Sequence, residues 1–255
     1  MRLSKILFLA LTVLASCGAE PVEFICHRGL KGEAPENTIP AIELALAAGC
    51  DVVEVDIRIS RDGQVVLMHD ADISRTTNGR GKVGEMDYEQ IRAFDAAVRF
   101  PDEFQGTHVP TLREAISATQ GHGKLYLDLK TRQVDLVTSA VRNSSFSDAT
   151  YYRVYTPNEA QRVCQLDPDA SVVIDIGSFS LGATLIEKLY QDCPNLVLGS
   201  DLNNWTEDSA AQAHSLGIPI IVNLLGTQST ARNLQRALSY EPKAVLVEAK
   251  DEVLK

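Results

Sequence analysis

The sequence has few basic residues and no apolar run long enough to span a bilayer. Its 255 residues contain 24 Lys and Arg against 34 Asp and Glu, which gives a formal net charge of −10. A general nucleic-acid binder needs a basic surface, so the charge argues against that class. Repeats and low-complexity tracts are missing too. With 45% hydrophobic and 23% charged residues, the composition predicts a folded globular protein rather than a disordered or multi-span membrane protein.

The N-terminus has the pattern of an export signal. Residues 6–14 are apolar and follow Arg2 and Lys5, and small residues then lead to Cys17. The run Leu14-Ala15-Ser16-Cys17 resembles the lipobox of bacterial lipoproteins. This resemblance implies a signal peptide over residues 1–16 and a mature chain, 17–255, anchored by lipid on Cys17 in the bacterial cell envelope, on the periplasmic or cell-surface side. A plain secretory peptide cut near Ala19 is the alternative.

The five cysteines do not form the closely spaced, even set of a disulfide-built scaffold. Outside the cytoplasm a single bridge can still form. Cys164 and Cys193 lie near the ends of successive helical patterns, so we expect them to pair. Cys26 and Cys50 lie at opposite ends of neighbouring strand patterns, and we expect both to be free.

Strand-like runs alternate with helix-like runs along most of the chain. Several of the strand-like runs are β-branched and almost unbroken, which is typical of parallel strands buried on both faces. Eight such runs favour a (β/α)8 TIM barrel in the α/β class. An open doubly wound sheet is the alternative, but no Gly-x-Gly-x-x-Gly follows the first run. The runs are residues 22–26, 51–57, 124–129, 151–155, 171–176, 195–199, 218–223 and 244–247.

Helix starts are marked by two Thr–Glu pairs. Thr111 precedes Glu114 by three residues, and Thr156 precedes Glu159 by the same spacing. In each pair the Thr side chain can accept from the Glu backbone N–H while the Glu side chain reaches back to the Thr backbone. The spacing therefore predicts two reciprocal capping boxes.

One segment interrupts the alternation after the second strand. Residues 58–109 contain an Asp62-Gly63 turn between two short strand-like runs, which indicates a hairpin, and then a polar stretch with weak periodicity. A connection of this length is far longer than a usual βα loop, and such loops are commonly functional. Since βα loops lie at the catalytic face of a barrel, we expect a small insertion over the active site.

Three carboxylates occur at the ends of expected strands. Glu54 and Asp56 alternate in the second strand and so share a face, and Asp128 lies at the end of the third. Three converging carboxylates repel one another unless a cation neutralises them. Oxygen ligands suit a hard ion such as Mg²⁺ or Ca²⁺. Taken singly, each carboxylate is equally compatible with an ordinary ion pair.

Histidines and cations accompany these carboxylates. His27 and Arg28 end the first strand, His69 closes the hairpin, and Lys130 follows Asp128. Two histidines suggest an acid and a base, and the two cations suggest contacts to an anion. The residues alone therefore point to a metal-dependent enzyme that acts on a phosphate, although a lone histidine at a strand end is more often structural.

The motifs over residues 26–130 closely resemble those of the glycerophosphodiester phosphodiesterases. They occur in the family's order. The matching runs are Cys26-His27-Arg28-Gly29, Ala34-Pro35-Glu36-Asn37-Thr38, Ala48-Gly49-Cys50-Asp51-Val52-Val53-Glu54-Val55-Asp56, Arg61-Asp62-Gly63-Gln64-Val65-Val66-Leu67-Met68-His69-Asp70, Thr76-Thr77-Asn78-Gly79, Val109-Pro110-Thr111-Leu112 and Leu127-Asp128-Leu129-Lys130.

The resemblance implies a barrel enzyme that cleaves small-molecule glycerophosphodiesters to glycerol 3-phosphate and an alcohol. It also implies particular roles for the residues in the motifs. These are a divalent metal on Glu54, Asp56 and Asp128, an acid–base pair of His27 and His69, phosphate contacts from Arg28 and Lys130, and support of the site by Glu36 and Asn37.

Three departures from the family pattern lie near the expected substrate position. The family usually has Glu where Asp128 stands, and it often has Trp before the Val-Asn of a late strand, where this chain has Ile220-Ile221-Val222-Asn223. The C-terminal Thr-Asp-x-Pro pattern is replaced around Glu248. These departures leave the preferred head group open.

Two other functions compete with the leading one. A phospholipase D- or sphingomyelinase-like phosphodiesterase is a related possibility, but those relatives usually lack the long insertion. A lipoprotein that binds glycerophosphodiesters without cleaving them belongs to a different class, but it has no need of the His27–His69 pair. The sequence leaves the oligomeric state open.

Overall fold

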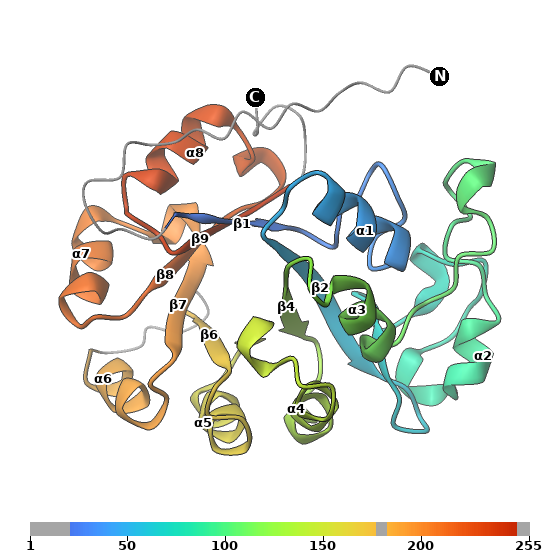
Figure 1. The fold of residues 1–255 in the computed structure, drawn as a ribbon, viewed down its shortest axis with the longest axis horizontal. Helices are drawn as coiled ribbons and strands as arrows, with labels where there is room; N and C mark the ends of the chain where they lie inside the picture. The colour runs from blue at the N-terminus through green and yellow to red at the C-terminus, as the bar shows by residue number, and fades with distance from the viewer. Residues whose placement is uncertain (1–20, 177–182, 249–255) are drawn as a thin grey trace.

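Eight parallel strands form a closed barrel at the centre of the molecule (Figure 1). The computed structural model describes residues 21–176 and 183–248. Hydrogen bonds join the strands in the order β1, β2, β4, β5, β6, β7, β8 and β9, and pairing of β9 with β1 closes the barrel. The strands are β1 (Glu23–Cys26), β2 (Val52–Ile59), β4 (Lys124–Leu129), β5 (Thr150–Val154), β6 (Ser171–Asp175), β7 (Leu196–Asp201), β8 (Ile220–Leu224) and β9 (Ala244–Val247).

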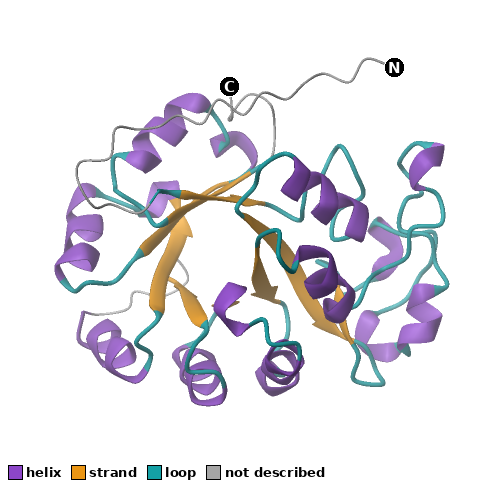
Figure 2. Cartoon of the chain, viewed as in Figure 1, coloured by secondary structure: helices purple, strands orange, loops and turns teal. Residues whose placement is uncertain are grey.

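Helices surround this barrel on the outside, as Figure 2 shows. They alternate with the strands along the chain, so the predicted (β/α)8 barrel is confirmed. Over residues 21–176 and 183–248, no helix has the length and apolar character needed to cross a membrane. The helices are α1 (Ile39–Ala47), α3 (Leu112–Thr119), α4 (Val134–Asn143), α5 (Pro157–Leu166), α6 (Ala183–Asp192), α7 (Glu207–Ser215) and α8 (Ala231–Leu238), with a shorter α2 (Tyr88–Arg92) between β3 and α3.

All eight expected strands are present, and their ends differ from the expected ones by at most two residues. The inner face of the barrel is filled by one apolar cluster: Ile25, Val52, Tyr126, Tyr151, Val173, Val197, Ile221, Ala244 and Leu246. Side chains alternate along a strand, so residues two positions further along face the same side. Those residues include Glu54, Asp128, Asn223 and Glu248. The barrel interior therefore changes from apolar to polar towards the carboxyl ends of the strands.

The segment between β2 and α3 begins with a hairpin. β3 (Val65–Leu67) pairs antiparallel with β2, and Gly63 in the turn has a φ of 83°, a value that favours glycine. The rest of the segment packs around a small apolar cluster of its own: Val66, Met68, Ile73, Val83, Ile91, Ala96 and Val109. In Figure 1 its helix α2 lies at the outer edge of the molecule, beside α1 and α3.

One of the two predicted capping boxes is complete and the other is not. At α3, Thr111 and Glu114 each accept from the other's backbone N–H. At α5, Thr156 accepts from the Glu159 N–H, but the Glu159 carboxylate accepts from the backbone N–H of Tyr155 at 3.2 Å. The Glu159 side chain thus reaches one residue further back, and the prediction of a reciprocal box there is wrong.

The part of the chain that the structure describes contains two disulfides, one more than expected. Cys164 and Cys193 are bridged, as predicted, with their Cα atoms 5.5 Å apart. Cys26 and Cys50 are bridged as well, with Cα atoms 6.0 Å apart, so the expectation that both are free is wrong. The reason is the stagger of the barrel. The last residue of β1, Cys26, pairs with Val53 near the start of β2, only three residues beyond Cys50, so the end of β1 lies close enough to the turn before β2 for the two cysteines to meet.

Candidate active site

The three carboxylates predicted as metal ligands come together at the carboxyl ends of β2 and β4. Asp56 pairs directly with Asp128 in the parallel register, and Glu54 lies two residues earlier on the same face. One oxygen from each of the three residues lies within 4.8 Å of the other two. All three side chains are buried.

This cluster suits a hard divalent cation. Burial, together with the charges of Asp56 and Asp128, holds the pKa of Glu54 well above its usual range. The ionised form of Glu54 is unfavourable next to Asp56 and Asp128, and a cation bound to all three would reduce this cost. The donors are all oxygen atoms, which fits Mg²⁺ or Ca²⁺ rather than a soft metal.

The loop between β1 and α1 holds two of these carboxylates in place. The backbone N–H of Arg28 donates to Glu54 at 2.7 Å. The Asn37 side chain donates to the Asp56 carboxylate at 2.8 Å and accepts from the Asp56 backbone N–H at 2.9 Å. Arg28 and Asn37 have φ values of 56° and 57°, in the left-handed region that is uncommon for residues other than glycine and that Asn adopts more readily than Arg. The loop thus accepts an uncommon backbone conformation at the two residues that orient Glu54 and Asp56.

Cations surround the third carboxylate. Lys130 Nζ lies 2.8 Å from the Asp128 carboxylate, 3.1 Å from the Tyr155 hydroxyl and 3.5 Å from Asp56. The Tyr155 hydroxyl donates to Asp128 at 2.5 Å, and Arg153 lies 3.5 Å from it. Although burial opposes ionisation, these cations and hydrogen bonds hold the pKa of Asp128 below its usual range.

His27 is paired with a carboxylate that the sequence did not mark as part of the site. Its Nδ1 lies 3.2 Å from Glu248, which also accepts from Lys31 at 2.9 Å. The Glu248 carboxylate only accepts hydrogen bonds and favours a proton on Nδ1, whereas the Lys31 ammonium, 3.1 Å from the same nitrogen, only donates. The other nitrogen, Nε2, lies 3.9 Å from Glu54 and faces the carboxylate cluster. Burial lowers the pKa of His27, although the hydrogen bond with Glu248 acts in the opposite direction. The lowered pKa keeps the ring neutral near pH 7.

His69 has an equivalent partner. Its Nδ1 lies 2.6 Å from Asp70, whose carboxylate also pairs with Arg75. The hydrogen bond from Arg75, together with that from His69, lowers the pKa of Asp70 to about 2. Arg58 donates to the backbone carbonyl of His69 at 2.7 Å and fixes the end of the hairpin against β2. Both histidines therefore have a carboxylate on Nδ1, although no hydrogen bond joins the two imidazoles over the described residues.

Glu36 connects the two halves of the site. Its carboxylate accepts from Arg28 at 2.9 Å and from Arg75 at 2.7 Å. These two arginines lower its pKa although burial acts in the opposite direction. Arg28 in turn lies 3.1 Å from Asp56. The predicted supporting residue Glu36 thus ties the insertion, through Arg75, to the loop that orients the carboxylate cluster.

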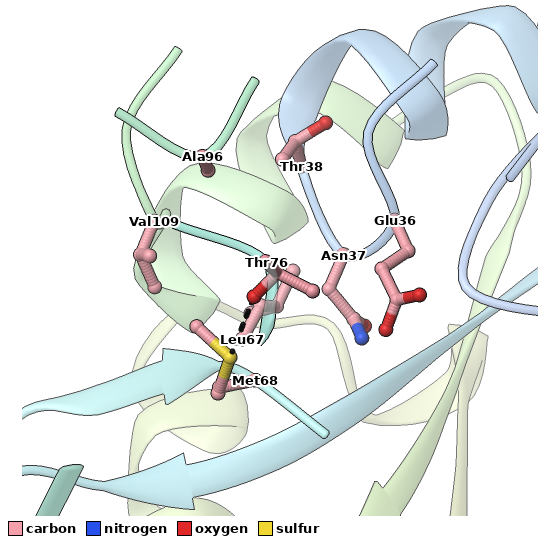
Figure 3. A pocket seen from close by; sticks show the side chains of 8 residues that line it. All are labelled: Glu36, Asn37, Thr38, Leu67, Met68, Thr76, Ala96 and Val109. Atoms are coloured by element: carbon pink, nitrogen blue, oxygen red, sulfur yellow. Dashed lines mark hydrogen bonds between the residues drawn. The ribbon is translucent and has the colours of Figure 1, made fainter. Parts of the chain in front are cut away.

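A small hollow lies along this junction. It has a volume of about 10 Å³ and is lined by the β1–α1 loop, β3 and the insertion. Figure 3 shows Glu36 and Asn37 on one side and Met68, whose sulfur accepts from the Thr76 hydroxyl at 3.4 Å, on the other. The space is about that of one water molecule, so it marks the contact between the two segments and cannot hold a substrate.

Several residues of the site received no role from the sequence. Arg75 and Glu248 act through contacts with Glu36 and His27, which lie far away in the chain, whereas Asp70 directly follows His69, so its contact could have been expected from that adjacency. Asn223, on the inner face of β8, is 1% exposed, and neither its amide nitrogen nor its carbonyl oxygen has a partner over residues 21–176 and 183–248. Its place in the Val-Asn motif was the available signal. Cys17, the predicted lipidation site, lies outside the described residues.

These features define a class of protein: a (β/α)8 barrel with a buried carboxylate cluster that could hold a divalent cation, beside two histidines. Comparison with known proteins makes the assignment specific. The model of the glycerophosphoryl diester phosphodiesterase family matches residues 27–172, more than half of the chain. The chain therefore belongs to the glycerophosphoryl diester phosphodiesterase family.

Individual relatives agree with this assignment. YhdW of Bacillus subtilis, a proposed glycerophosphodiester phosphodiesterase, is 30% identical over 224 residues, which cover 78% of this chain and 92% of YhdW. Glycerophosphodiester phosphodiesterase 1 of Rattus norvegicus is 39% identical over 125 residues, 48% of this chain and 38% of the rat protein. The similarity to the rat enzyme therefore spans well under half of that protein.

Solved structures support the shared fold. A glycerophosphodiester phosphodiesterase from Agrobacterium tumefaciens has a TM-score of 0.78 at 24% identity, and the similarity covers 92% of this chain and 100% of that one. A phosphodiesterase from Oleispira antarctica, solved with its product sn-glycerol 3-phosphate, has a TM-score of 0.76 at 23% identity. That similarity covers 91% of this chain and 94% of the Oleispira chain.

Proposed function

We propose that this protein hydrolyses glycerophosphodiesters to glycerol 3-phosphate and an alcohol. The observation that carries the proposal is the cluster of Glu54, Asp56 and Asp128 within 4.8 Å, beside two histidines that each have a carboxylate on Nδ1. A binding protein for such compounds needs the cations of the site but not the acid–base pair. Family membership supports the same reaction.

In the proposed reaction, His27 and His69 move the protons. One imidazole removes a proton from the nucleophile, which is water or the substrate's own 2-hydroxyl, and the other protonates the oxygen of the leaving alcohol. The net reaction adds water across the P–O bond of the alcohol, in one step when water attacks, or in two when the 2-hydroxyl attacks and water then opens the resulting cyclic phosphate. Glu248 and Asp70 contact Nδ1 of the two rings, which leaves each Nε2 as the nitrogen that transfers the proton, and both carboxylates therefore belong to the proposed mechanism.

Glu54, Asp56 and Asp128 would hold the divalent cation, either Mg²⁺ or Ca²⁺. When bound, the cation would neutralise the phosphate and polarise its oxygens. Arg28 and Lys130, which lie beside Asp56 and Asp128, would contact the remaining phosphate oxygens and hold the phosphorus in line with the nucleophile.

An assay of the purified Cys17→Ser protein tests the reaction. We expect glycerol 3-phosphate to appear from glycerophosphocholine or a related diester, and each of His27→Ala and His69→Ala to lower the rate by about 10²–10⁴-fold. His122→Ala, in an exposed turn, is the matched control. Turnover that persists in both histidine variants would contradict the acid–base assignment, and tight binding without turnover in the parent protein would indicate a binding lipoprotein instead.

The cation site has a test that does not depend on activity. We expect Mg²⁺ or Ca²⁺ to raise the unfolding temperature of the parent protein and EDTA to reverse the rise. The Asp56→Asn variant should lose the response, whereas Asp169→Asn, on the exposed surface, should keep it. An equal response in both variants would place the cation elsewhere.

We further propose that the chain is exported and anchored by lipid on Cys17. The two disulfides support the export part, because such bonds persist in oxidising compartments. Fractionation of the producing cells tests the anchor: the parent protein should sediment with membranes and the Cys17→Ser protein should be released. Unchanged membrane association of the variant would count against it.

A further inference from the structure

A cavity of about 430 Å³ opens beside the candidate active site. Its walls come from the β1–α1 loop, the insertion after β2 and the ends of β8 and β9. The charged and aromatic groups that line it are Lys31, Glu36, Arg75, Arg99, Phe100 and Glu248. Its volume lies in the range of ordinary small-molecule sites, roughly 300–1,000 Å³.

The cavity lies between the partners of the two histidines. On one side, Glu248 and Lys31 contact His27 Nδ1. On the other, Arg75 pairs with Asp70, which holds His69. A group that occupies this space therefore contacts residues that hold His27 and His69 in place, and the cavity is open, so the group can leave to solvent. These features suit the end of the leaving alcohol that lies farthest from the phosphate.

Some charged side chains of the wall already have an ion-pair partner, and one has none among the described residues. Lys31 pairs with Glu248 at 2.9 Å, and Arg75 pairs with Glu36 at 2.7 Å, so both carboxylates already have partners. Arg99 has no hydrogen bond or ion pair over residues 21–176 and 183–248, and its side chain is exposed at the cavity edge. The cavity therefore has one cation that is not neutralised and no carboxylate that is free.

This arrangement suits an anion better than a cation. A quaternary ammonium group is bound by a cage of aromatic faces or by free carboxylates, and this wall has a single aromatic ring, Phe100. Resting on the proposed function, we propose that the cavity receives the leaving alcohol of the glycerophosphodiester and that Arg99 selects alcohols that carry an anionic group.

The size of the preference follows from the exposure of Arg99. An ion pair at a solvent-exposed edge changes binding by up to about fivefold. Arg99→Gln should therefore lower kcat/KM for an anionic leaving group by up to about fivefold relative to a neutral one, and Arg99→Glu, which also adds repulsion, by up to about 25-fold. Arg99→Lys should retain most of the preference.

Three diesters of glycerol 3-phosphate provide the test. The leaving alcohol is cationic in glycerophosphocholine, neutral in glycerophosphoglycerol and anionic in deacylated cardiolipin. We expect the full-length parent protein with its cation bound to cleave the anionic compound with the highest kcat/KM and glycerophosphocholine with the lowest. Arg92→Glu, another exposed arginine of the insertion that does not line the cavity, is the matched control and should behave like the parent.

The outcomes separate this inference from the proposed function. Release of glycerol 3-phosphate from none of the three compounds would overturn the proposed function. Turnover of all three with a preference for choline, or with a substrate ratio that Arg99→Glu leaves unchanged, would overturn the role of Arg99 alone. A ratio that shifts equally in Arg92→Glu would assign the effect to the general charge of the insertion and would also overturn it.

Discussion

The Cys26–Cys50 disulfide closes the segment that carries much of the site, and its removal should separate stability from activity. The bridge spans a sequence separation of 24 and encloses the β1–α1 loop, including Arg28 and Asn37. The Cys164–Cys193 bridge has a sequence separation of 29, covers α5, β6 and α6, and encloses neither a histidine of the proposed acid–base pair nor a carboxylate of the Glu54–Asp56–Asp128 cluster. The double variants Cys26→Ala/Cys50→Ala and Cys164→Ala/Cys193→Ala are therefore matched perturbations.

Loop-closure entropy predicts nearly equal losses of stability for the two. A loop of 24 residues gives about 3.4 kcal/mol and one of 29 residues about 3.6 kcal/mol. For a protein of this size, either loss lowers the unfolding temperature by roughly 7–14 °C. Differential scanning calorimetry or urea unfolding should thus give similar values for the two variants.

The effect on turnover should differ. Without the Cys26–Cys50 bridge, the left-handed residues Arg28 and Asn37 keep their hydrogen bonds to Glu54 and Asp56 but lose the covalent closure of the segment that carries them. Residues in such conformations cost about 1–3 kcal/mol and persist only where the surroundings hold them. We expect the loop to relax and kcat to fall roughly tenfold, less than the ~10²-fold cost of a 1 Å displacement.

Turnover is measured well below both unfolding temperatures, so that the protein is folded in every sample. The Cys164→Ala/Cys193→Ala variant should retain the parent kcat within about twofold, as substitutions remote from a site usually do. Equal kcat values for the two variants would refute the idea that the Cys26–Cys50 bridge supports the site. An unchanged free energy of unfolding in both would refute the entropy argument.

Two further predictions concern the carboxylates that hold the histidines. Asp70→Asn keeps the shape of the side chain but not its negative charge. We expect kcat to fall by about 10²-fold or more in a steady-state assay, because the His69 tautomer is no longer fixed. Asp72→Asn, on the exposed surface, should have no such effect in the same assay. Glu248 has a pKa lowered to about 2, since hydrogen bonds from His27 and Lys31 outweigh its burial. Its contribution to stability is therefore fully present above the unfolded pKa near 4.5 and is lost as the pH falls through about 2. The difference in unfolding free energy between the parent and Glu248→Gln, measured in urea at pH 7, 4 and 3, should be largest at pH 7; a difference that grows on acidification would contradict this sign.

The barrel could be predicted because its strands carry a local signal. Parallel strands covered on both faces are almost continuously apolar, and β4 and β9 were therefore located to the residue. The carboxylate cluster followed for the same reason. Once β2 and β4 are neighbours, their carboxyl ends meet, and Asp56 must lie near Asp128.

Features that depend on the stagger of the barrel or on long-range contacts could not be predicted in this way. The pairing of Cys26 with Cys50 requires the end of β1 to lie level with the start of β2, which no run of residues reveals. Glu248 was visible only as a departure from the family pattern, and its contact with His27 spans 221 positions in the sequence. Arg75 likewise reaches Glu36 only because the insertion folds back onto the β1–α1 loop.

The charges of the site explain how a protein with a net charge of −10 can receive an anionic substrate. Six cations of the site face seven carboxylates, and Glu54 is the carboxylate whose burial and neighbours favour its protonated form. Without a divalent cation, six positive groups then balance six negative ones. A divalent cation held by Glu54, Asp56 and Asp128 would add two positive charges and favour the ionised form of Glu54, which would give the site a local excess of one positive charge. The cation would also neutralise Asp56 and Asp128, so that Arg28 and Lys130 could contact phosphate. An anion would therefore be attracted to the loaded site, although the surface as a whole repels it. The cations are Arg28, Lys31, Arg58, Arg75, Lys130 and Arg153, and the carboxylates are Glu36, Glu54, Asp56, Asp70, Asp128, Asp175 and Glu248.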